Sequence, residues 1–410
     1  PKPERPVQTL GVLGAGLMGA GIAQVTASRG TRVLLKDIKP EFVSRGMAQI
    51  EGNLNAKVKR RKLPGFDRDL TMSRIVGLDH DGNWRDQFKT CDLVVEAVLE
   101  DLAVKHAVIK EMEEYLPDHA IFATNTSGLR VSDIAKASKR PENVVGMHYF
   151  SPVDKMPLLE IIRSKDTSDA TVAAAYDLGL RQGKTIIVTK DVSGFYVNRC
   201  LGPYMVEVMS CIGMGADLGA VDKAMTNFGF PVGPITLADE VGIDVASKIV
   251  PNLEEELGVR TQGASTGPFK DLLEQGLLGK KSNGGFFTYD NKGKRQGTNP
   301  AAQEVVKKYV EEGHEKPTEQ DIQERCSSRF ALEAAFCLQD EVIESPMHAE
   351  VGAVFGVGFP PFLGGPLRMI DSIGIGAFND RLRRYQDLYG EQWTLPELLV
   401  DMEKGGKTFY

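Results

Sequence analysis

The sequence predicts an α/β fold in which a doubly wound parallel sheet is followed by an all-α, internally duplicated domain. From Thr9 to about Thr189, short apolar runs alternate with segments of helical periodicity, which is the pattern of a parallel sheet covered by helices. Beyond Asp191 the apolar runs largely stop, and two similar Gly/Pro-rich segments recur among helical patterns. The second half is therefore expected to contain two copies of one helical unit.

Length and composition describe an ordinary globular protein. A chain of 410 residues exceeds what one core usually serves, so two or three domains are expected. The net charge of −7 gives no reason to expect nucleic-acid binding, and no apolar run is long enough to span a membrane. The five cysteines have no metal-ligand spacing with the six histidines, so we expect reduced thiols and no metal site. Because the chain begins without Met, signal or transit pattern, it is expected to belong to something longer.

A glycine-rich turn follows the first predicted strand, Thr9 to Leu13. It reads G-A-G-L-M-G and leads into a helical pattern, which is the order that a dinucleotide site requires. Gly14 allows the tight turn, Gly16 lets backbone amides approach a pyrophosphate, and Gly19 lets the helix pack closely on the strand. We therefore predict a Rossmann-type dinucleotide-binding domain over residues 1–190. The alternative is a glycine-rich turn that binds no ligand.

The second predicted strand, Arg32 to Ile38, selects between cofactors because it carries Asp37 near its end. A carboxylate at this place suits the 2′-hydroxyl of an adenosine ribose and repels a 2′-phosphate, so NAD is favoured over NADP. Lys36 and Lys39 flank Asp37 and leave NADP open as the alternative.

A basic run, Lys57 to Lys62, ends the long helical stretch that begins at Pro40. Cations are favoured at a helix C-terminus, so the run is explained as a solvated helix face. In an acidic chain it is also the most concentrated positive patch, and it suits an anionic part of a substrate.

Two later strands end in polar residues. Ligands of open α/β sheets sit outside the carboxyl ends of strands. The range Glu96 to Lys105 begins at the end of the strand Asp92 to Val98 and continues beyond it, so it is expected to border the cofactor. The strand Ala120 to Thr124 ends in N-T-S, Asn125 to Ser127. Such residues by default cap the following helix, but the place of Ser127 beside the next strand suggests a catalytic role.

A predicted hairpin brings His148 and Glu160 together. The strands Val144 to His148 and Leu158 to Ile162 fold back on each other across a turn with two prolines. Both faces of the second strand are apolar, so Glu160 is expected to be buried and to need a partner. A carboxylate that orients an imidazole makes a general base near neutral pH. The alternative is a core histidine beside a glutamate that faces solvent.

The C-terminal half is divided by composition. The segment F-G-F-P-V-G-P, 228–234, is repeated as G-F-P-P-F-L-G-G-P, 358–366. We therefore predict a first helical copy over 191–298, a charged linker over 299–321 and a second copy over 322–410.

Four motifs, G-A-G-L-M-G, T-N-T-S, G-M-H-Y-F-S-P-V and G-F-Y-V-N-R, together resemble the 3-hydroxyacyl-CoA dehydrogenase family. The resemblance runs through the whole chain, including the duplicated C-terminal part. More narrowly, H-Y-F-S-P-V-D-K-M and G-V-G-F-P-P-F-L-G-G-P are similar to the dehydrogenase part of mitochondrial trifunctional enzyme alpha subunits.

The resemblance implies a set of site residues. His148 is expected to be the base that takes the 3-hydroxyl proton, with Glu160 as its orienting partner. Ser127 is expected to bind the reacting oxygen and border the nicotinamide, and Asn198 to contact the thioester region. The residues expected to bind NAD are Gly14, Gly16, Met18, Gly19, Asp37, Val98, Leu99, Glu100, Lys105 and Ser127. Those expected to bind substrate are Ser127, Asn198, Arg60 and Lys57, the last two on CoA phosphates.

The resemblance also implies an activity, partners and a location. The activity is NAD-dependent oxidation of (S)-3-hydroxyacyl-CoA to 3-ketoacyl-CoA, a step of fatty-acid β-oxidation. An upstream enoyl-CoA hydratase domain, a thiolase subunit, homo-oligomer formation and a mitochondrial location are expected on the same basis. The alternatives are a dehydrogenase of a small hydroxy acid without CoA, and a catalytically silent NAD-binding scaffold of a multienzyme complex.

Overall fold

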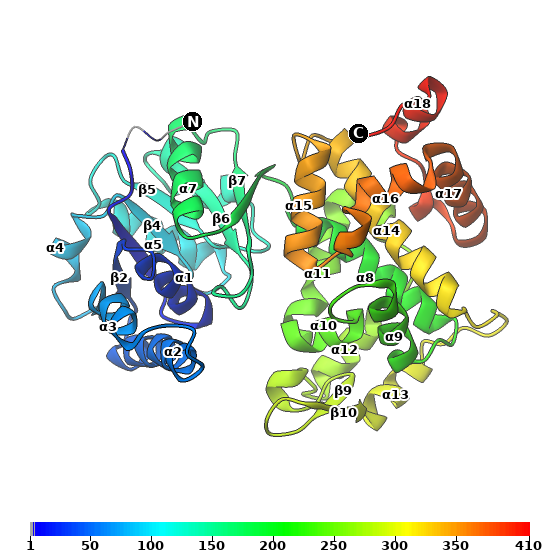
Figure 1. Ribbon diagram of the computed structural model, residues 1–410, viewed down its shortest axis with the longest axis horizontal. Helices are drawn as coiled ribbons and strands as arrows, with labels where there is room; N and C mark the ends of the chain where they lie inside the picture. Colours follow the sequence, from blue (N-terminus) through cyan, green and yellow to red (C-terminus); the bar gives the residue numbers. More distant parts are fainter. Residues whose placement is uncertain (1–2, 4) are drawn as a thin grey trace. The chain divides into compact units, whose positions relative to one another are not determined.

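The structure is a computed structural model that describes residue 3 and residues 5–410. The chain forms two compact units that divide between Val192 and Ser193, within a few residues of the boundary expected at residue 190. The N-terminal unit is drawn from blue to green and the C-terminal unit from green to red in Figure 1. Within the described residues, we find no helix that is both long and apolar enough to cross a membrane.

The N-terminal unit is organised around one eight-stranded sheet with the order β3-β2-β1-β4-β5-β6-β7-β8. The first six strands of the sequence run parallel, whereas β7 pairs antiparallel with β6, and β8 pairs parallel with β7. The predicted doubly wound sheet is confirmed, and β7 and β8 extend it in the opposite direction. The strands are β1 (Thr9–Leu13), β2 (Arg32–Lys36), β3 (Ile75–Leu78), β4 (Leu93–Glu96), β5 (Ile121–Thr124), β6 (Val144–Tyr149), β7 (Leu158–Arg163) and β8 (Thr185–Lys190).

Helices flank this sheet (Figure 1). Apolar side chains of the strands and helices form one buried core. They are α1 (Leu17–Ala27), α2 (Pro40–Lys59), α3 (Gly65–Ser73), α4 (Trp84–Phe88), α5 (Leu102–Glu113), α6 (Val131–Ala135) and α7 (Asp169–Arg181), with a 3₁₀ turn at Pro141–Asn143. A Cβ atom on Gly19 would lie 1.8 Å from the carbonyl oxygen of Gly14, and Gly14 itself has φ +94°. Only glycine therefore lets α1 start this close to the end of β1.

The C-terminal unit is helical, as predicted, apart from one small hairpin of β9 (Phe287–Tyr289) and β10 (Arg295–Thr298). Its helices are α8 (Val197–Gly213), α9 (Leu218–Phe228), α10 (Pro234–Val241), α11 (Ile243–Leu257), α12 (Gly267–Glu274), α13 (Pro300–Lys307), α14 (Glu319–Gln339), α15 (Pro346–Val357), α16 (Pro366–Ile373), α17 (Ile375–Tyr389) and α18 (Glu397–Gly405). Short 3₁₀ turns lie at Gly258–Thr261, Lys280–Ser282, Pro361–Leu363 and Glu391–Trp393.

The charged range 299–321 was predicted as a linker, but it begins with a packed helix. Ala302, Val305 and Val306 on α13 are buried, while Glu304 and Lys307 between and beside them are exposed. The charges thus occupy the outer face of an amphipathic helix. The charged composition of the range led to the linker prediction, because composition does not show the spacing of the apolar residues.

The internal duplication is visible helix by helix. An eight-residue helix followed at once by a fifteen-residue helix occurs as α10 and α11, and again as α16 and α17. The joints are glycines with positive φ, Gly242 at +103° and Gly374 at +91°. A backbone with positive φ favours glycine, because glycine has no Cβ atom. Both copies therefore have a glycine at the joint between the two helices.

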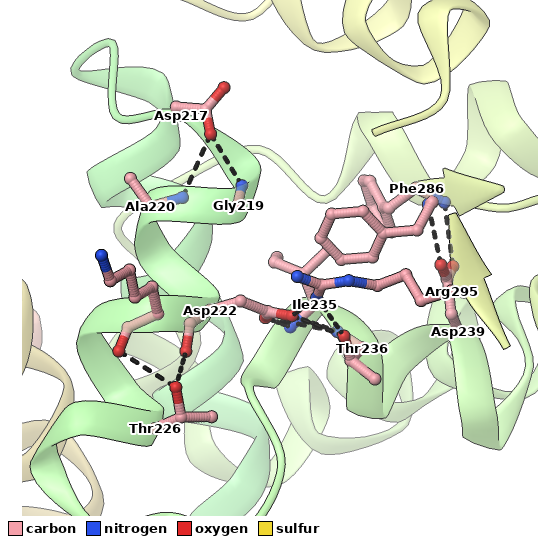
Figure 2. Close-up of polar contacts among 12 residues, drawn as sticks. Asp217, Gly219, Ala220, Asp222, Thr226, Ile235, Thr236, Asp239, Phe286 and Arg295 are labelled. Atoms are coloured by element: carbon pink, nitrogen blue, oxygen red, sulfur yellow. Dashed lines mark hydrogen bonds and ion pairs between the residues drawn. The ribbon is translucent and has the colours of Figure 1, made fainter. Parts of the chain in front are cut away.

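Buried carboxylates repeat the same capping contacts in the two copies. Asp222 on α9 accepts the Ile235 N–H at the start of α10 at 2.8 Å and pairs with Arg295 at 2.7 Å (Figure 2). Glu350 on α15 accepts the Arg368 N–H at the start of α16 at 2.8 Å. Each carboxylate satisfies amide groups that the helix itself leaves without partners.

A second pair of carboxylates binds the extended segment that follows each set of helices. Asp239 on α10 accepts the Phe286 N–H at 2.9 Å (Figure 2). Asp371 on α16 accepts the N–H groups of Phe409 and Tyr410 at 3.0 and 3.1 Å. The two copies therefore share polar contacts as well as helix order.

The predicted copies do not form separate domains, because α8 and α14 pack on each other in one unit. Arg325 on α14 lies 2.5 Å from Glu207 on α8, and Arg199 on α8 lies 3.4 Å from Glu333 on α14. Arginine and glutamate are separated by the same number of residues in each helix. The contact is thus reciprocal, as between two identical subunits.

Candidate active site

His148 and Glu160 face each other across the β6–β7 pair, as the sequence pattern predicts. The Nδ1 atom of His148 lies 2.7 Å from Oε2 of Glu160, and the two side chains are 4% and 0% exposed. A carboxylate at Nδ1 favours the tautomer with its proton there, which leaves the basic lone pair on Nε2. This is the geometry of an imidazole prepared to take up a proton and to be stabilised afterwards.

The turn between β6 and β7 is held by hydrogen bonds from Lys184. Its ammonium group donates to the carbonyl oxygens of Val153 and Met156, the latter at 2.7 Å. Burial lowers the pKa of Lys184 to about 8, and the nearby carboxylate of Asp154 opposes this shift. These contacts hold the segment that follows His148 in place.

The turn after β5 carries Ser127 and is tied to the His148 strand. The Tyr149 N–H donates to Oδ1 of Asn125 at 2.9 Å. From sequence, Asn125 was expected only to cap the following helix. Its place at a strand end, next to a strand with a candidate base, is the signal that could have indicated this contact. Ser127 thus follows β5, and His148 lies near the end of β6. Because these two strands pair in parallel, both residues are at the same edge of the sheet.

Glu100, expected to border the cofactor, organises the Ser127 turn. One carboxylate oxygen accepts the N–H groups of Ser127 and Gly128 at 2.9 and 3.0 Å and the Thr126 hydroxyl at 2.5 Å. Burial alone would raise the pKa of Glu100, but the positive charge of Lys105 and these hydrogen bonds hold it below its usual range.

Replacing Glu100 with glutamine is expected to make stability less dependent on pH. Because the pKa of Glu100 is lower in the folded than in the unfolded protein, the charged carboxylate stabilises the fold. This stabilisation is complete above the unfolded pKa of about 4.3, and it is lost as pH falls through the folded pKa. Because Glu100 is 44% exposed, the loss in Glu100→Gln at pH 7 should not exceed about 1 kcal/mol. Urea unfolding at pH 7 and pH 3.5 measures it, and a wild-type-to-variant difference that stays constant with pH would contradict this assignment.

Lys105 is buried in an ion pair rather than open to a ligand. Its Nζ atom lies 2.7 Å from Glu96 and 3.1 Å from Glu100, and the side chain is 1% exposed. The second oxygen of Glu96 accepts the Thr124 hydroxyl at 2.8 Å. The residue predicted to contact the cofactor thus neutralises a buried carboxylate at the end of β4.

The glycine-rich loop and Asp37 adopt the arrangement of a dinucleotide site. The Ala15 N–H donates to Oδ2 of Asp37 at 2.7 Å, which fixes the carboxylate beside the loop. An added Cβ atom on Gly16 would meet no atom within 4 Å, so open space adjoins this backbone. That space suits a pyrophosphate on the N-terminus of α1, where amide groups of the helix lack partners.

Three exposed large apolar side chains follow the strands at this edge of the sheet, and only one of them was named from sequence. Leu17, Ile38 and Leu99 are 61%, 64% and 71% exposed, after the neighbouring strands β1, β2 and β4. Only Leu99 was on the predicted list. Exposed leucine and isoleucine at strand ends suit the flat faces of a dinucleotide's rings, and their position after each strand was the missed signal.

The basic run stands at the C-terminal end of α2, where Lys57 lies 3.1 Å from Asp154 in the β6–β7 turn. Arg60 ends the helix and is exposed. The run is therefore joined to the segment that follows His148. Of the two residues predicted to bind CoA phosphates, Lys57 already has a carboxylate partner.

Asn198 lies in the first turn of α8, in the C-terminal unit, whereas His148, Glu160 and Ser127 lie in the N-terminal unit. Next to it, Arg199 pairs with Glu256 at 2.7 Å, which fixes the start of α8. The expected contact of Asn198 with substrate stays a prediction.

In the described part of the chain, no three or more His, Cys, Asp or Glu side chains are grouped so as to hold a metal ion.

Comparisons with known proteins agree with this geometry. Residues 9–192 match the model of the 3-hydroxyacyl-CoA dehydrogenase NAD-binding domain, and residues 194–289 match that of the 3-hydroxyacyl-CoA dehydrogenase C-terminal domain. The chain is 44% identical over 406 residues to the fatty acid oxidation complex subunit alpha of Idiomarina loihiensis. That match covers 98% of this chain and 56% of the relative, so the chain spans about half the length of the curated protein.

Two solved structures share the fold over long stretches. The 3-hydroxybutyryl-CoA dehydrogenase of Escherichia coli K12 superposes with a TM-score of 0.85 at 26% identity, covering 98% of this chain and 100% of its own. The (S)-3-hydroxybutyryl-CoA dehydrogenase of Ralstonia eutropha superposes with a TM-score of 0.65 at 33% identity, covering 70% and 100%.

The expected mitochondrial location is wrong. The curated relative that matches nearly the whole chain comes from a bacterium, which has no mitochondria. The expectation depended on two short motifs, and motifs that build a fold or a site carry no information about the compartment.

Proposed function

Since the chain belongs to the 3-hydroxyacyl-CoA dehydrogenase family, we propose that it oxidises (S)-3-hydroxyacyl-CoA to 3-ketoacyl-CoA with NAD, as a step of fatty-acid β-oxidation. The observation that carries this proposal is the buried pair of His148 and Glu160, 2.7 Å apart, in the same sheet as the dinucleotide loop. A base and a nicotinamide site at one sheet edge are the two parts that alcohol oxidation requires.

His148 acts as the general base in this proposal. Its Nε2 atom takes the proton of the substrate's 3-hydroxyl group while NAD, when bound, accepts the hydride from C3. Glu160 then stabilises the imidazolium through Nδ1, and in the reverse direction the same nitrogen returns the proton. Ser127 donates to the reacting oxygen, and Asn198 contacts the thioester region.

The cofactor is proposed to be held by the loop and strand ends described above. The backbone of Gly14, Gly16, Met18 and Gly19 receives the pyrophosphate, and Asp37 accepts the adenosine ribose hydroxyls. Val98 and Leu99 border the nicotinamide, whereas Glu100 and Lys105 shape that border through the contacts they make with each other and with Ser127. Arg60 and its basic neighbours bind the CoA phosphates.

The activity is tested by following NADH formation with (S)-3-hydroxybutyryl-CoA and longer thioesters. We expect turnover with the S enantiomer and NAD, and little with the R enantiomer, NADP or free 3-hydroxybutyrate. Equal activity on the free acid would favour the small-hydroxy-acid alternative. Normal NADH binding without turnover of any thioester would favour the silent scaffold.

We further propose that the chain works beside other β-oxidation activities. The curated relative is described as a subunit of a fatty acid oxidation complex and is longer than this chain, which supports the presence of partners. That these are an upstream enoyl-CoA hydratase domain and a thiolase subunit is proposed from the family resemblance. Homo-oligomer formation is proposed from the resemblance alone. Co-purification of a thiolase with the natural protein tests the proposed thiolase partner; a natural protein that purifies without a thiolase would contradict that partner.

A further inference from the structure

Phe66 is the most exposed large apolar side chain of the described residues, at 74%. It lies in the first turn of α3, and Leu70, one turn further along the same face, is 37% exposed. The inner face of α3 is provided instead by Thr71 and Met72, which face the fold. A single exposed apolar residue is common on protein surfaces, so Phe66 alone does not indicate a ligand site.

A cationic loop, Lys59–Lys62, leads from α2 into α3 and lies close to Phe66 in the chain. Its four side chains are exposed, and in the described part of the chain we find no ion pair or side-chain hydrogen bond that they form. Arg61 has φ +56°, an unusual value for a residue with a side chain, and it turns the chain at the end of α2. Four cations and an exposed aromatic ring therefore lie within a few residues of each other.

The position of Phe66 beside this loop is fixed by contacts between α2 and α3. Arg68, in the same turn of α3 as Phe66, donates to Oδ1 of Asn55 on α2 at 2.9 Å. The Lys62 N–H donates to the Lys57 carbonyl oxygen at 2.9 Å, which closes the end of α2. A ring held in this way loses little conformational freedom when a flat ligand stacks on it.

The surface belongs to the substrate side of the unit rather than to the NAD side. Lys57 is joined to Asp154, six residues after His148. Asp37, which suits the NAD ribose, precedes the other end of α2, and twenty helical residues span about 30 Å. The adenine of NAD therefore lies far from Phe66.

We infer that Phe66 is a stacking platform for the adenine base of the substrate's CoA moiety, with the cationic loop binding the adjacent phosphates. This inference rests on the proposed function, since it names where one part of the thioester substrate binds. The 3′-phosphoadenosine diphosphate of CoA combines several negative charges with one aromatic base, and the surface presents the complementary groups in the same order. Base stacking on an aromatic side chain tolerates water on its other face, as an exposed ring requires.

An anionic membrane is the competing occupant, and α3 fits it poorly. Asp69, 66% exposed, lies between Phe66 and Leu70 on the outer face of the helix. Two apolar side chains interrupted by a carboxylate offer little area to insert into lipid. One aromatic ring is enough, however, for one purine base.

The test compares two substrates in wild-type protein and in Phe66→Ala: acetoacetyl-CoA, and acetoacetyl-pantetheine, which lacks the nucleotide. We expect KM for acetoacetyl-CoA to rise roughly ten-fold or more, the usual size of a lost stacking contact. The kcat, the KM for NADH and kcat/KM for acetoacetyl-pantetheine should stay within about two-fold. Phe66→Trp should restore the wild-type KM, and Phe362→Ala, at an exposed aromatic of the C-terminal unit, serves as the matched control.

A binding measurement separates failure of this inference from failure of the proposed activity. Adenosine 3′,5′-bisphosphate is titrated into wild-type and Phe66→Ala protein, which needs no turnover, and weaker binding to the variant is expected. Equal binding to both proteins, an equal KM increase with acetoacetyl-pantetheine, or a raised KM for NADH would overturn the inference. So would loss of binding to phosphatidylglycerol vesicles in Phe66→Ala with an unchanged KM for acetoacetyl-CoA.

Discussion

Replacing His148 with glutamine is expected to lower kcat for acetoacetyl-CoA reduction by roughly 10²- to 10⁴-fold, the usual range for loss of a general acid or base. Glutamine fills a similar space and still reaches the carboxylate of Glu160, so the hairpin should remain folded. NADH affinity, measured by fluorescence, should be unchanged, because the dinucleotide loop is formed by other strands. Turnover and cofactor binding therefore separate in this variant.

Two further variants show whether the effect belongs to the pair. Glu160→Gln keeps a hydrogen-bonding group opposite His148 but removes the charge that stabilises the imidazolium, so an intermediate loss of kcat is expected. His314→Gln, at an exposed histidine outside both the sheet and the helices, should leave kcat unchanged. Near-normal turnover in His148→Gln would remove His148 from the mechanism.

Replacing Lys105 with methionine is expected to destabilise the protein by about 3–5 kcal/mol, because it leaves Glu96 as a buried carboxylate without its cation. Methionine has a similar length and apolar stem to lysine, so the substitution removes mainly the positive charge. Lys110→Met on the exposed face of the same helix is the matched control and should change the free energy of unfolding by no more than about 0.5 kcal/mol. Urea denaturation at pH 7 measures both variants.

The Lys105 variant also separates two views of this residue. A direct cofactor contact, as the sequence suggested, predicts a fold of nearly wild-type stability with weak NADH binding. The buried ion pair predicts the opposite order of effects. A Lys105→Met protein as stable as the Lys110→Met control would contradict the structural role assigned here.

Periodicity and turn chemistry predicted the parts of the fold that depend on local sequence. The β1 strand and the β6–β7 hairpin are strongly apolar, and the glycine loop has its own spacing, so their place in the sheet could be read directly. The β3 strand was missed because Ile75–Leu78 is short and only partly buried at the sheet edge. The helix α13 was missed because its exposed charges dominate the composition of a short segment.

The candidate site was predicted where partners are near in sequence or directly opposite in a hairpin, as for His148 and Glu160. It was less accurate where partners come from distant strand ends. Glu100 follows β4 and Lys105 lies in the next helix, α5, but nothing local indicates that Glu100 accepts amides of the Ser127 turn or that Lys105 neutralises Glu96. The reciprocal pairs of Arg199 with Glu333 and Arg325 with Glu207 needed the packing of α8 on α14.

A crystal structure of the protein with NADH and acetoacetyl-CoA would show whether His148 is the catalytic base. We expect the 3-keto oxygen to lie within about 3 Å of Nε2 of His148, the reach of a catalytic hydrogen bond. Glu160 should remain on Nδ1, and the C4 atom of the nicotinamide should face C3 of the substrate. A substrate oxygen bound by another proton donor, with His148 more than one water molecule away, would contradict this role of His148.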